Sequence, residues 1–438
     1  MISIRSVALR FDPLQKNEIL GMWKEFCREE FPDKKHVRSY VYVHTPYCSS
    51  KCKFCMYESE PLLKEGALTE EKKSLLNEAL ETAEAVEGLE FDGLYFGGGT
   101  PTIYEEDDFY DVVSAVRSCF KLSGRAVSTC EMNPNSATPG KIKTAVEHGI
   151  KRISLGVQSL TPKVLEVAGR KEADLMRTAE LIAFAKECGA SVVNIDLLAP
   201  LPGETEKTFL KTVEKASGLG SDTVTLYCLQ NLGQQYSPSE MAMSGESLGD
   251  WDRIKEIFTR GLEGSRLKIS KESVKLTTCL IAGNSNNLYN EDNRYELHSR
   301  RPVAVLGLGR NSCSNLFGKV FYKNSGRDGA ALDSAGRRYI GYRKDVFEEA
   351  LDMILLYLRD GVSLPFQHFE SVFGYDAEGF VRDNFGMLID MGFISFSSSS
   401  VECGIKFADA PKFFEFSKTI KQLIFISKPR NLLKFGAE

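Results

Sequence analysis

Three cysteines, Cys48, Cys52 and Cys55, lie within eight residues of one another, directly after an apolar stretch with the pattern of a β-strand. Thiolates are the usual ligands of iron–sulfur clusters, and a ferredoxin uses four of them for each [4Fe–4S] cluster. Because no fourth cysteine is close in sequence, three thiolates would hold three irons and leave the fourth iron open. The spacing therefore predicts a [4Fe–4S] cluster that binds a further molecule.

Zinc and disulfide bonds are the alternatives for this group of cysteines. A structural zinc site takes four nitrogen or sulfur ligands, commonly as two spaced pairs, and the nearest histidine, His44, precedes the cysteines instead of following them. Disulfides need an oxidising compartment, but the chain starts without the basic residues and long apolar core of a secretory signal, so we expect a cytoplasmic protein. The other cysteines are scattered singly, which predicts reduced thiols and no second cluster; they are Cys27, Cys119, Cys130, Cys188, Cys228, Cys279, Cys313 and Cys403.

The composition is that of a globular protein, with 42% apolar residues, 26% charged residues and a formal net charge of −5. No apolar run reaches the ~18 residues of a membrane span, and a mildly acidic chain without a long basic run is a poor nucleic-acid binder. Its 438 residues exceed what one hydrophobic core usually supports. We expect an N-terminal extension at residues 1–37, a main domain at 38–325 and a C-terminal domain at 326–438.

Short apolar strands alternate with helix-like segments up to about residue 229, which indicates a parallel sheet covered by helices. The predicted strands are 40–44, 93–96, 127–132, 152–157, 192–198 and 223–229. The predicted helices between them are 69–86, 106–119, 140–147, 173–188 and 206–217. Six such repeats fit an α/β fold of the partial (β/α)6 TIM-like barrel type, in which active sites form at the carboxyl ends of the strands.

Polar residues or glycines stand at the ends of these predicted strands, as an active site there requires. They are Gly97, Gly98, Gly99 and Thr100 at the end of the second strand, Glu131 and Asn133 at the end of the third, Gln158 at the end of the fourth and Asp196 at the end of the fifth. Glycines let a ligand approach the backbone closely. Any one of these residues alone fits a helix cap or a turn equally well. Together, at successive strand ends, they predict a cavity.

The combined motifs resemble the radical SAM superfamily, and within it the branch typified by oxygen-independent coproporphyrinogen III oxidase. They are Tyr-Val-His-x-Pro-Tyr-Cys, Phe-Gly-Gly-Gly-Thr-Pro-Thr, Glu-x-Asn-Pro, Ser-Leu-Gly-Val-Gln-Ser and Leu-Pro-Gly-Glu-Thr, and the resemblance covers roughly residues 38–325. In this superfamily S-adenosylmethionine (SAM) binds the open iron, and an electron from the cluster splits it into methionine and a 5′-deoxyadenosyl radical. The resemblance thus implies a [4Fe–4S] cluster and one or two SAM molecules.

The resemblance also assigns roles to the residues at the strand ends. It places Tyr42 near the adenine, Gly98 and Thr100 around the methionine, and Glu131, Gln158, Arg170 and Asp196 around the sugar and the carboxylate. Further cofactor-binding residues are Gly97, Gly99 and Asn133. These types suit the roles, because carboxylates accept hydrogen bonds from ribose hydroxyls and an arginine pairs with a carboxylate.

Departures from the branch pattern bear on the reaction. Coproporphyrinogen oxidases carry another cysteine where this chain has Tyr57, and haem chaperones carry a His-Asn-x-x-Tyr-Trp element that residues 287–295 lack. Methylases of the branch, which are thought to bind two SAM molecules, are compatible with Tyr57 and with the glutamine-rich segment that contains Gln230. We assign both residues to catalysis. We expect methyl or methylene transfer to an sp² carbon of a conjugated natural product or tetrapyrrole, with oxidative decarboxylation and haem chaperoning without turnover as alternatives.

From about residue 345 the pattern changes to helices followed by a short hairpin, which indicates a mainly α, winged-helix-like domain. Its acidic balance argues against DNA binding, and we expect it to cover the barrel mouth because radical chemistry needs water excluded. The expected partners are a small-molecule substrate and a reducing protein such as flavodoxin or ferredoxin. We expect no nucleic-acid or membrane partner, and a monomer.

Overall fold

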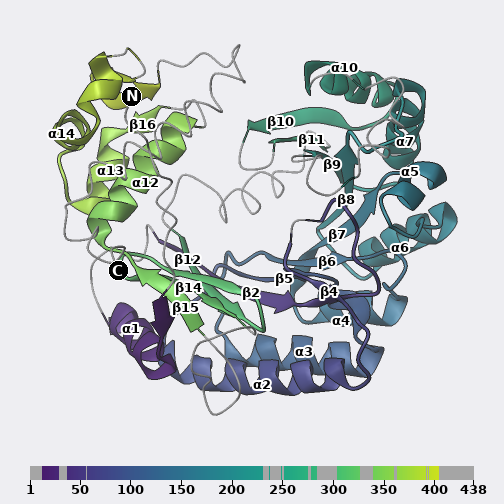
Figure 1. Cartoon of the computed structure of the whole chain (residues 1–438), viewed down its shortest axis with the longest axis horizontal. Coiled ribbons are helices and arrows are strands. Elements are labelled where there is room, and N and C mark those ends of the chain that lie inside the picture. The colour runs from purple at the N-terminus through teal and green to yellow at the C-terminus, as the bar shows by residue number, and fades with distance from the viewer. Residues whose placement is uncertain are drawn as a thin grey trace. The chain divides into compact units, whose positions relative to one another are not determined.

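The computed structural model describes residues 12–28, 37–55, 57–229, 236, 248, 251–274, 278–283, 303–325, 339–359, 363–390, 392 and 394–403. These residues belong to two compact units, drawn in Figure 1. The core unit comprises the described residues within 39–295 and 307–312. The terminal unit comprises those up to residue 38, those within 296–306 and those from residue 313 onward. The domain boundaries expected at residues 37 and 325 stay a prediction.

A sheet of six parallel strands forms the centre of the core unit, and all six were predicted. In hydrogen-bonded order they are β2 (Arg38–Thr45), β5 (Gly93–Gly98), β6 (Ser128–Met132), β7 (Ile150–Gln158), β8 (Val192–Ala199) and β9 (Thr223–Cys228). Two antiparallel strands, β11 (Thr278–Gly283) and β10 (Lys268–Val274), extend the sheet beyond β9 and were not predicted. Within the described residues the strands run from β2 to β10 without closing on one another, so the α/β sheet is open.

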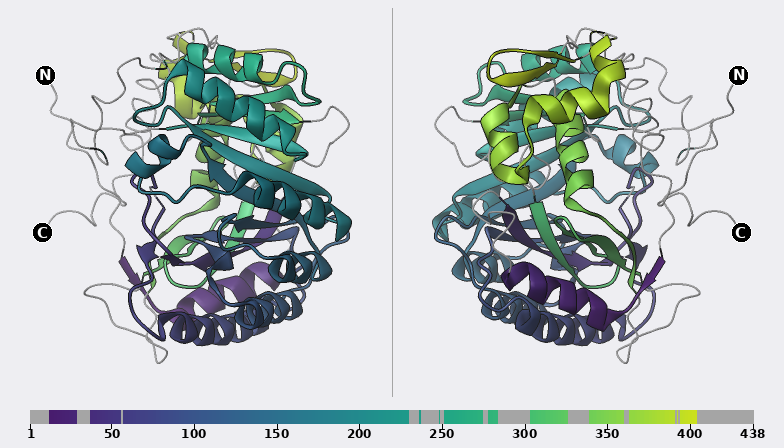
Figure 2. Two further views of the ribbon diagram at one scale, coloured as in Figure 1. Left: turned by 90° about the vertical axis from the view of Figure 1, so that its right-hand side faces the viewer. Right: turned by 90° about the vertical axis from the view of Figure 1, so that its left-hand side faces the viewer.

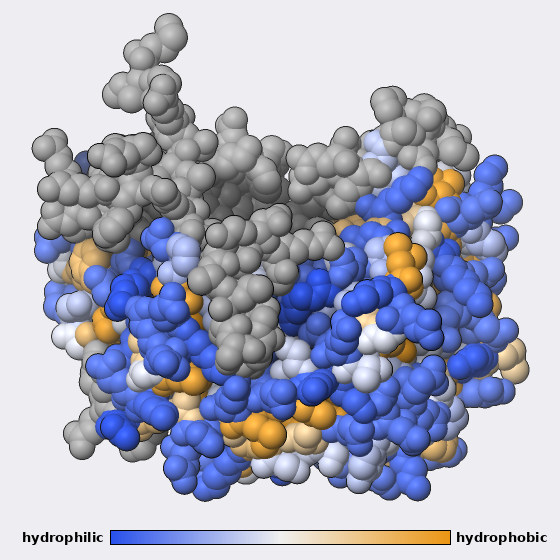
Figure 3. Space-filling model, turned by 60° about the horizontal axis from the view of Figure 1, so that its bottom comes forward, coloured by the Kyte–Doolittle hydropathy of each residue, from blue (hydrophilic) through white to orange (hydrophobic). Residues whose placement is uncertain are grey.

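Helices cover the outer face of this sheet, as Figure 2 shows. The five predicted helices are confirmed as α2 (Ala67–Ala85), α3 (Glu106–Cys119), α4 (Pro139–Glu147), α6 (Leu175–Glu187) and α7 (Glu206–Gly218), and the structure adds α5 (Pro162–Val167) and α10 (Trp251–Gly261). Each longer helix buries an apolar stripe, as α3 does with Phe109, Val112, Val113 and Val116. The face that carries α2 and α3 is mainly hydrophilic with small hydrophobic patches (Figure 3). Among the described residues, no helix combines the length and apolarity that crossing a membrane requires.

Side-chain caps set where several of these helices begin. The Thr138 side chain accepts a hydrogen bond from the Lys141 amide at the start of α4, and Asp174 does the same for Arg177 at the start of α6. Helix α7 begins with a capping box formed with Thr205. Such caps satisfy backbone N–H groups that have no partner within the helix. Those of α4 and α7 fix the helix starts shortly after the ends of β6 and β8, which carry predicted site residues.

The terminal unit joins the beginning of the chain to its later part. Its antiparallel strands are, in order, β1 (Asp12–Leu14), β15 (Tyr339–Arg343), β14 (Val320–Asn324), β13 (Cys313–Leu316) and β12 (Val303–Leu308). Helix α1 (Lys16–Arg28) belongs to the same unit. Its Trp23 is fully buried and donates a hydrogen bond from Nε1 to the Tyr322 hydroxyl at 3.0 Å.

The C-terminal part of this unit has the predicted order of helices and a hairpin. It contains α12 (Val346–Arg359), β16 (Leu364–Pro365), α13 (Phe366–Phe373), α14 (Ala377–Asp390), β17 (Ile394–Phe396) and β18 (Ser400–Cys403), and the three strands form a small antiparallel sheet. Phe369 packs against Phe373 and Phe380 with ring centroids 4.9 and 5.2 Å away. The contact with Phe380 joins α13 to α14. The role of this part as a cover stays a prediction.

Candidate functional site

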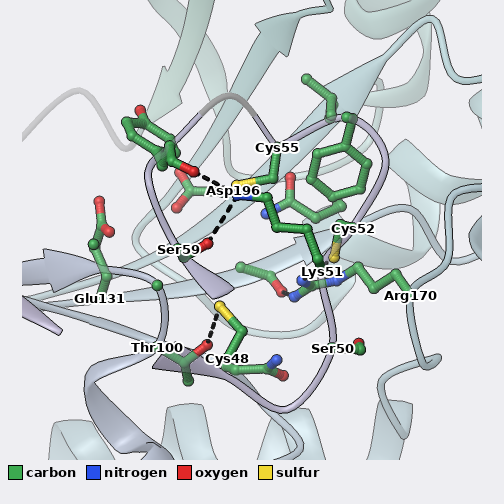
Figure 4. A pocket seen from close by; sticks show the side chains of 18 of the residues that line it. Cys48, Ser50, Lys51, Cys52, Cys55, Ser59, Thr100, Glu131, Arg170 and Asp196 are labelled. Carbon is green, nitrogen blue, oxygen red and sulfur yellow. Dashed lines mark hydrogen bonds between the residues drawn. The ribbon is translucent and has the colours of Figure 1, made fainter. Parts of the chain in front are cut away.

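A pocket lies at the carboxyl ends of the parallel strands, and Figure 4 shows the three cysteine side chains around it together with Arg170 and Asp196. Twelve predicted site residues line it: Cys48, Cys52, Cys55, Tyr57, Gly98, Gly99, Thr100, Glu131, Asn133, Gln158, Arg170 and Asp196. Tyr42 and Gly97 lie behind this lining, and Gln230 lies outside the described residues. The structure thus brings together residues that are up to 148 positions apart in the sequence.

The cysteines are carried by a loop, residues 48–60, which we call the cysteine loop. Its two ends are joined because β3 (Tyr47–Cys48) pairs in parallel with β4 (Glu60–Pro61). Inside the loop, Lys51 Nζ donates to the Tyr57 carbonyl and, at 3.0 Å, to Ser59 Oγ. The amide of Cys55 donates to the Cys52 carbonyl at 3.1 Å. These contacts within the loop help to order its backbone.

Phe54 anchors the cysteine loop to the core unit. Its ring packs against an apolar cluster that includes Val164, Ala168 and Leu198. The neighbouring amide, that of Lys53, donates to the Ala168 carbonyl at 2.9 Å. The sequence prediction missed this anchor, although an aromatic residue inside an otherwise polar loop is a usable signal.

The glycines after β5 allow this strand to pack directly against the cysteine loop. A Cβ atom on Gly99 would lie 2.5 Å from the Tyr47 carbonyl oxygen and 3.0 Å from Cys48 Sγ. Gly98 has φ +102°, a left-handed conformation that favours glycine. Thr100 Oγ1 donates to Cys48 Sγ at 3.3 Å. The space beside Gly99 is thus filled by the protein itself, and an approach of a ligand to these glycines stays a prediction.

Glu131 is held by a tyrosine that the sequence prediction missed. Its Oε1 accepts a hydrogen bond from the Tyr95 hydroxyl, and the Tyr95 ring lies 5.9 Å from that of Tyr42. The Tyr42 hydroxyl and His44 Nδ1 are 2.9 Å apart, and His44 Nε2 lies 2.9 Å from the Glu58 carbonyl. A carbonyl only accepts, so Nε2 carries a proton and a neutral His44 accepts from Tyr42 through Nδ1. Tyr42 therefore supports the pocket wall from behind.

Asp196 sits at the end of a buried network of short polar side chains on β7, β8 and β9. Its Oδ2 accepts from Ser154 Oγ at 2.7 Å and its Oδ1 accepts from Asn194 Nδ2 at 2.9 Å. Asn194 Oδ1 in turn accepts from Thr223 Oγ1 at 2.8 Å and from Thr225 Oγ1 at 2.9 Å. The four partners were not predicted, although polar residues at every second position of buried strands signal such a network. It fixes the carboxylate before any ligand binds.

Gln158 ends β7 with an unusual backbone conformation, and Arg170 connects this strand to the cysteine loop. The β7–β8 register shifts between Gly156 and Gln158, and Gln158 has φ +71°, which is unusual for a residue with a side chain. Arg170 donates from one terminal nitrogen to the Gly156 carbonyl and from the other to Cys52 Sγ at 3.6 Å. One arginine thus spans two parts of the pocket wall.

A buried carboxyl, Glu204, joins the ends of β7 and β8. It is 1% exposed and accepts from Ser159 Oγ at 3.3 Å and from the Leu201 amide at 3.2 Å. Burial raises the pKa of Glu204 to about 8, against the opposing effect of these hydrogen bonds. Its carboxyl group is therefore largely protonated at neutral pH.

Burial also raises the pKa of two thiols in the pocket wall. It raises that of Cys55, with Lys51 acting in the opposite direction. It raises that of Cys228, which also lines the pocket, to about 11. Cys228 therefore stays a protonated thiol at neutral pH.

The donor set fits a cluster better than a single metal ion. Within the described residues, no three His, Cys, Asp or Glu side chains converge as the ligands of one ion. A [4Fe–4S] cluster takes its thiolates at separate irons, so they surround the cluster without meeting at one point. Cys48, Cys52 and Cys55, placed around one pocket by one loop, have this kind of arrangement. A tetrahedral zinc site would need four converging ligands.

Comparison with known proteins gives matches in both sequence and fold. The profile of the radical SAM superfamily matches residues 42–216. The oxygen-independent coproporphyrinogen III oxidase of Bradyrhizobium diazoefficiens is 27% identical over 188 residues, 43% of this chain and 42% of its own length. The heme chaperone HemW of Mycobacterium tuberculosis is 31% identical over 191 residues, 43% of this chain and 49% of its own. The anaerobilin synthase of Escherichia coli O157:H7 is 27% identical over 223 residues, which are 50% of this chain and 49% of its own length.

The chain thus matches half or less of the length of these curated relatives. The coproporphyrinogen III oxidase HemN of Escherichia coli, a radical SAM enzyme, superposes with a TM-score of 0.72 over 96% of this chain and 95% of its own, at 16% identity. At 16% identity, this structural similarity shows that the chain shares the fold of HemN, and it shows nothing about activity. Proteins of the radical SAM superfamily use a [4Fe–4S] cluster and SAM. Residues 42–216 thus form a radical SAM domain, and the chain has relatives among the oxygen-independent coproporphyrinogen III oxidases and haem chaperones and the fold of HemN.

Proposed function

We propose that this chain is a radical SAM enzyme whose cluster is held by Cys48, Cys52 and Cys55. The observation that carries the proposal is that these cysteines share one pocket with the polar residues of four strand ends. When bound, the cluster supplies the electron that cleaves SAM to methionine and a 5′-deoxyadenosyl radical.

The pocket residues have hydrogen-bonding groups that suit SAM. Each carboxylate oxygen of Asp196 accepts a hydrogen bond within the protein, and because a carboxylate oxygen can accept more than one, this pattern suits a ribose hydroxyl. Arg170 has five N–H donors, so its contacts to Gly156 and Cys52 leave others for a carboxylate. The roles assigned to Glu131, Gln158 and Arg170 are part of the proposal.

For the reaction we propose methyl or methylene transfer to an sp² carbon of a conjugated natural product or tetrapyrrole, with a second SAM as the carbon source. Tyr57 supports this reading because it lines the pocket, is 62% exposed and stands where the oxidase pattern has a cysteine. Gln230 is assigned to the same step. The reducing partner is a flavodoxin or ferredoxin, and we place the protein in the cytoplasm as a monomer.

Haem chaperoning is the second candidate. The heme chaperone HemW of Mycobacterium tuberculosis is 31% identical, against 27% for the Bradyrhizobium oxidase. A chaperone would bind haem stoichiometrically and would not need to turn over SAM. Decarboxylation, the third candidate, is favoured by the oxidase relatives but not by Tyr57.

The test is mass spectrometry of SAM-derived products after anaerobic cluster reconstitution and reduction. We expect wild type to form 5′-deoxyadenosine and Cys52→Ala to form none, because two thiolates do not hold the cluster. Cys188→Ala, which removes a thiol outside the pocket, is the matched control and should behave as wild type.

The other products separate the candidates. S-adenosylhomocysteine beside 5′-deoxyadenosine supports carbon transfer. Stoichiometric haem uptake without 5′-deoxyadenosine favours the chaperone. A reconstituted protein that holds neither iron nor SAM would overturn the proposal.

A further inference from the structure

A short segment far along the chain contacts the base of the cysteine loop. Arg310 donates from a terminal nitrogen to Glu60 Oε1 at 2.6 Å, and its guanidinium group lies over the Tyr47 ring, 5.0 Å from the centroid. Tyr47 and Glu60 are paired directly across β3 and β4, and the next pair begins with Cys48. Arg310 therefore contacts both ends of the cysteine loop, one residue before its first cysteine.

Helix α2 holds Arg310 in this place through two buried carboxylates. The Arg310 amide donates to Glu71 Oε1 at 3.1 Å, and Arg310 Nε lies 3.5 Å from Glu71 Oε2. One residue earlier, the Gly309 amide donates to Glu78 Oε2 at 2.8 Å. Glu71 and Glu78 are 7% and 3% exposed, and a buried carboxylate is costly unless it has such partners.

The backbone at Gly309 is fixed by close contact. Its φ is +87°, and a Cβ atom there would lie 2.5 Å from the His44 carbonyl oxygen. This oxygen belongs to the end of β2, the strand that runs into the cysteine loop. The segment is thus seated between α2 and the end of β2, and the Arg310 side chain reaches the loop from this fixed point.

We propose that Arg310 is a positioning residue that holds the two ends of the cysteine loop together before the cluster binds. The inference rests on the proposed cluster site. A loop that is already ordered loses less conformational entropy when it binds a ligand. By ordering the loop, Arg310 therefore favours cluster uptake. Arginine suits the task because its planar group pairs with a carboxylate and covers an aromatic ring at the same time. A lysine would keep the charge but not this geometry.

The test is hydrogen exchange of the full-length apoprotein, followed peptide by peptide by mass spectrometry. In Arg310→Met we expect the peptides covering residues 47–61 to exchange at least about tenfold faster, while those of β7 keep wild-type rates. Arg310→Lys should be intermediate, since it keeps one ion pair. Arg253→Met is the matched control, because Arg253 forms ion pairs with Glu206 and Glu256 away from the pocket.

Cluster loading gives a second readout. After anaerobic reconstitution, we expect Arg310→Met to bind less iron and sulfide per chain than wild type, Arg310→Lys to recover part of the loss, and Arg253→Met to load fully. If Arg310→Met does not fold, Glu60→Gln removes the negative charge of the loop-side partner, which weakens the ion pair and leaves the contacts to Glu71, and faster exchange of residues 47–61 is again expected.

Two outcomes would overturn the proposed positioning role of Arg310. One is exchange of residues 47–61 within about twofold of wild type in Arg310→Met and Glu60→Gln. The other is an equal loss of protection throughout the core unit, which would make Arg310 an ordinary stabilising residue. Failure of the proposed function would look different, because wild type itself would then take up no cluster while the exchange results stood unchanged.

Discussion

The two sides of the pocket position their functional groups in different ways. On the cysteine side, a loop is held by backbone hydrogen bonds, by the close packing of Gly99 and by Arg310. On the carboxylate side, Asp196 is held by short side chains on regular strands, with Asn194 in the middle. A loop depends on many separate attachments, whereas a strand shares the rigidity of its sheet. We therefore expect damage on the cysteine side to stay local and damage on the carboxylate side to weaken the whole core unit.

The largest effect on stability should come from Asn194→Ala. Asn194 is fully buried, and its loss leaves the hydroxyls of Thr223 and Thr225 without their acceptor. We expect the free energy of unfolding to fall by about 3 kcal/mol, measured by denaturant unfolding. Asn384→Ala, which removes one hydrogen bond to the neighbouring helix turn, is the control and should cost less than about 1 kcal/mol. Equal losses of stability in the two variants would contradict the expectation that damage on the carboxylate side weakens the whole core unit.

Gly99→Ala should have a smaller effect on stability but a marked effect on the cysteine side. The added Cβ atom would collide with the Tyr47 carbonyl and crowd Cys48 Sγ, so the loop must shift. We expect a loss of about 1–3 kcal/mol of stability together with lower iron content after reconstitution. Gly218→Ala places its Cβ atom in open space and should load iron as wild type does. Normal iron content in Gly99→Ala would show that the close packing of β5 against the loop is dispensable.

The dependence of stability on pH concerns Glu204, which joins two strand ends on the carboxylate side. The folded state raises the pKa of this carboxyl from its ordinary 4.5 to about 8, so it binds the proton more tightly than the unfolded chain does. Its contribution to stability is therefore complete below pH 4.5 and is lost as the pH rises towards 8, by at most ~1.4 kcal/mol per pH unit.

Glu204→Gln imitates the protonated carboxyl and should flatten this dependence in unfolding experiments across the same pH range. The exposed Glu166 on α5 offers the control, because Glu166→Gln should leave the dependence as it is in wild type. A Glu204→Gln variant with the wild-type slope would show that another group is responsible.

The six parallel strands were predictable because strands buried on both faces read as short apolar runs. The pocket was predictable for a related reason, since parallel strands bring their carboxyl ends to one edge of the sheet. The helix α5 and the strand pair β10 and β11 are short and carry no clear period, so the prediction missed them. Short apolar segments do not distinguish helix from strand.

The supports behind the predicted residues were harder to find. Asn194 could have been identified from the sequence, because it is a polar residue inside a buried strand. Arg310 could not, because its partner Glu60 is 250 positions away and both residues are ordinary surface types. The left-handed backbone conformation of Gln158 also could not be predicted from the local sequence, because glycine is the residue type that indicates such a conformation. Contacts distant in sequence are thus where the structure adds most to the site.

The burial of Trp23 in the terminal unit has an optical consequence. The chain has two tryptophans, and the other, Trp251, begins α10 in the core unit. Each compact unit therefore carries its own intrinsic fluorophore. With Trp251 replaced by phenylalanine, the emission of Trp23 reports the opening of the terminal unit alone, and with Trp23 replaced the signal reports the core unit. Fluorescence can thus show whether the two units unfold in one cooperative transition or in two.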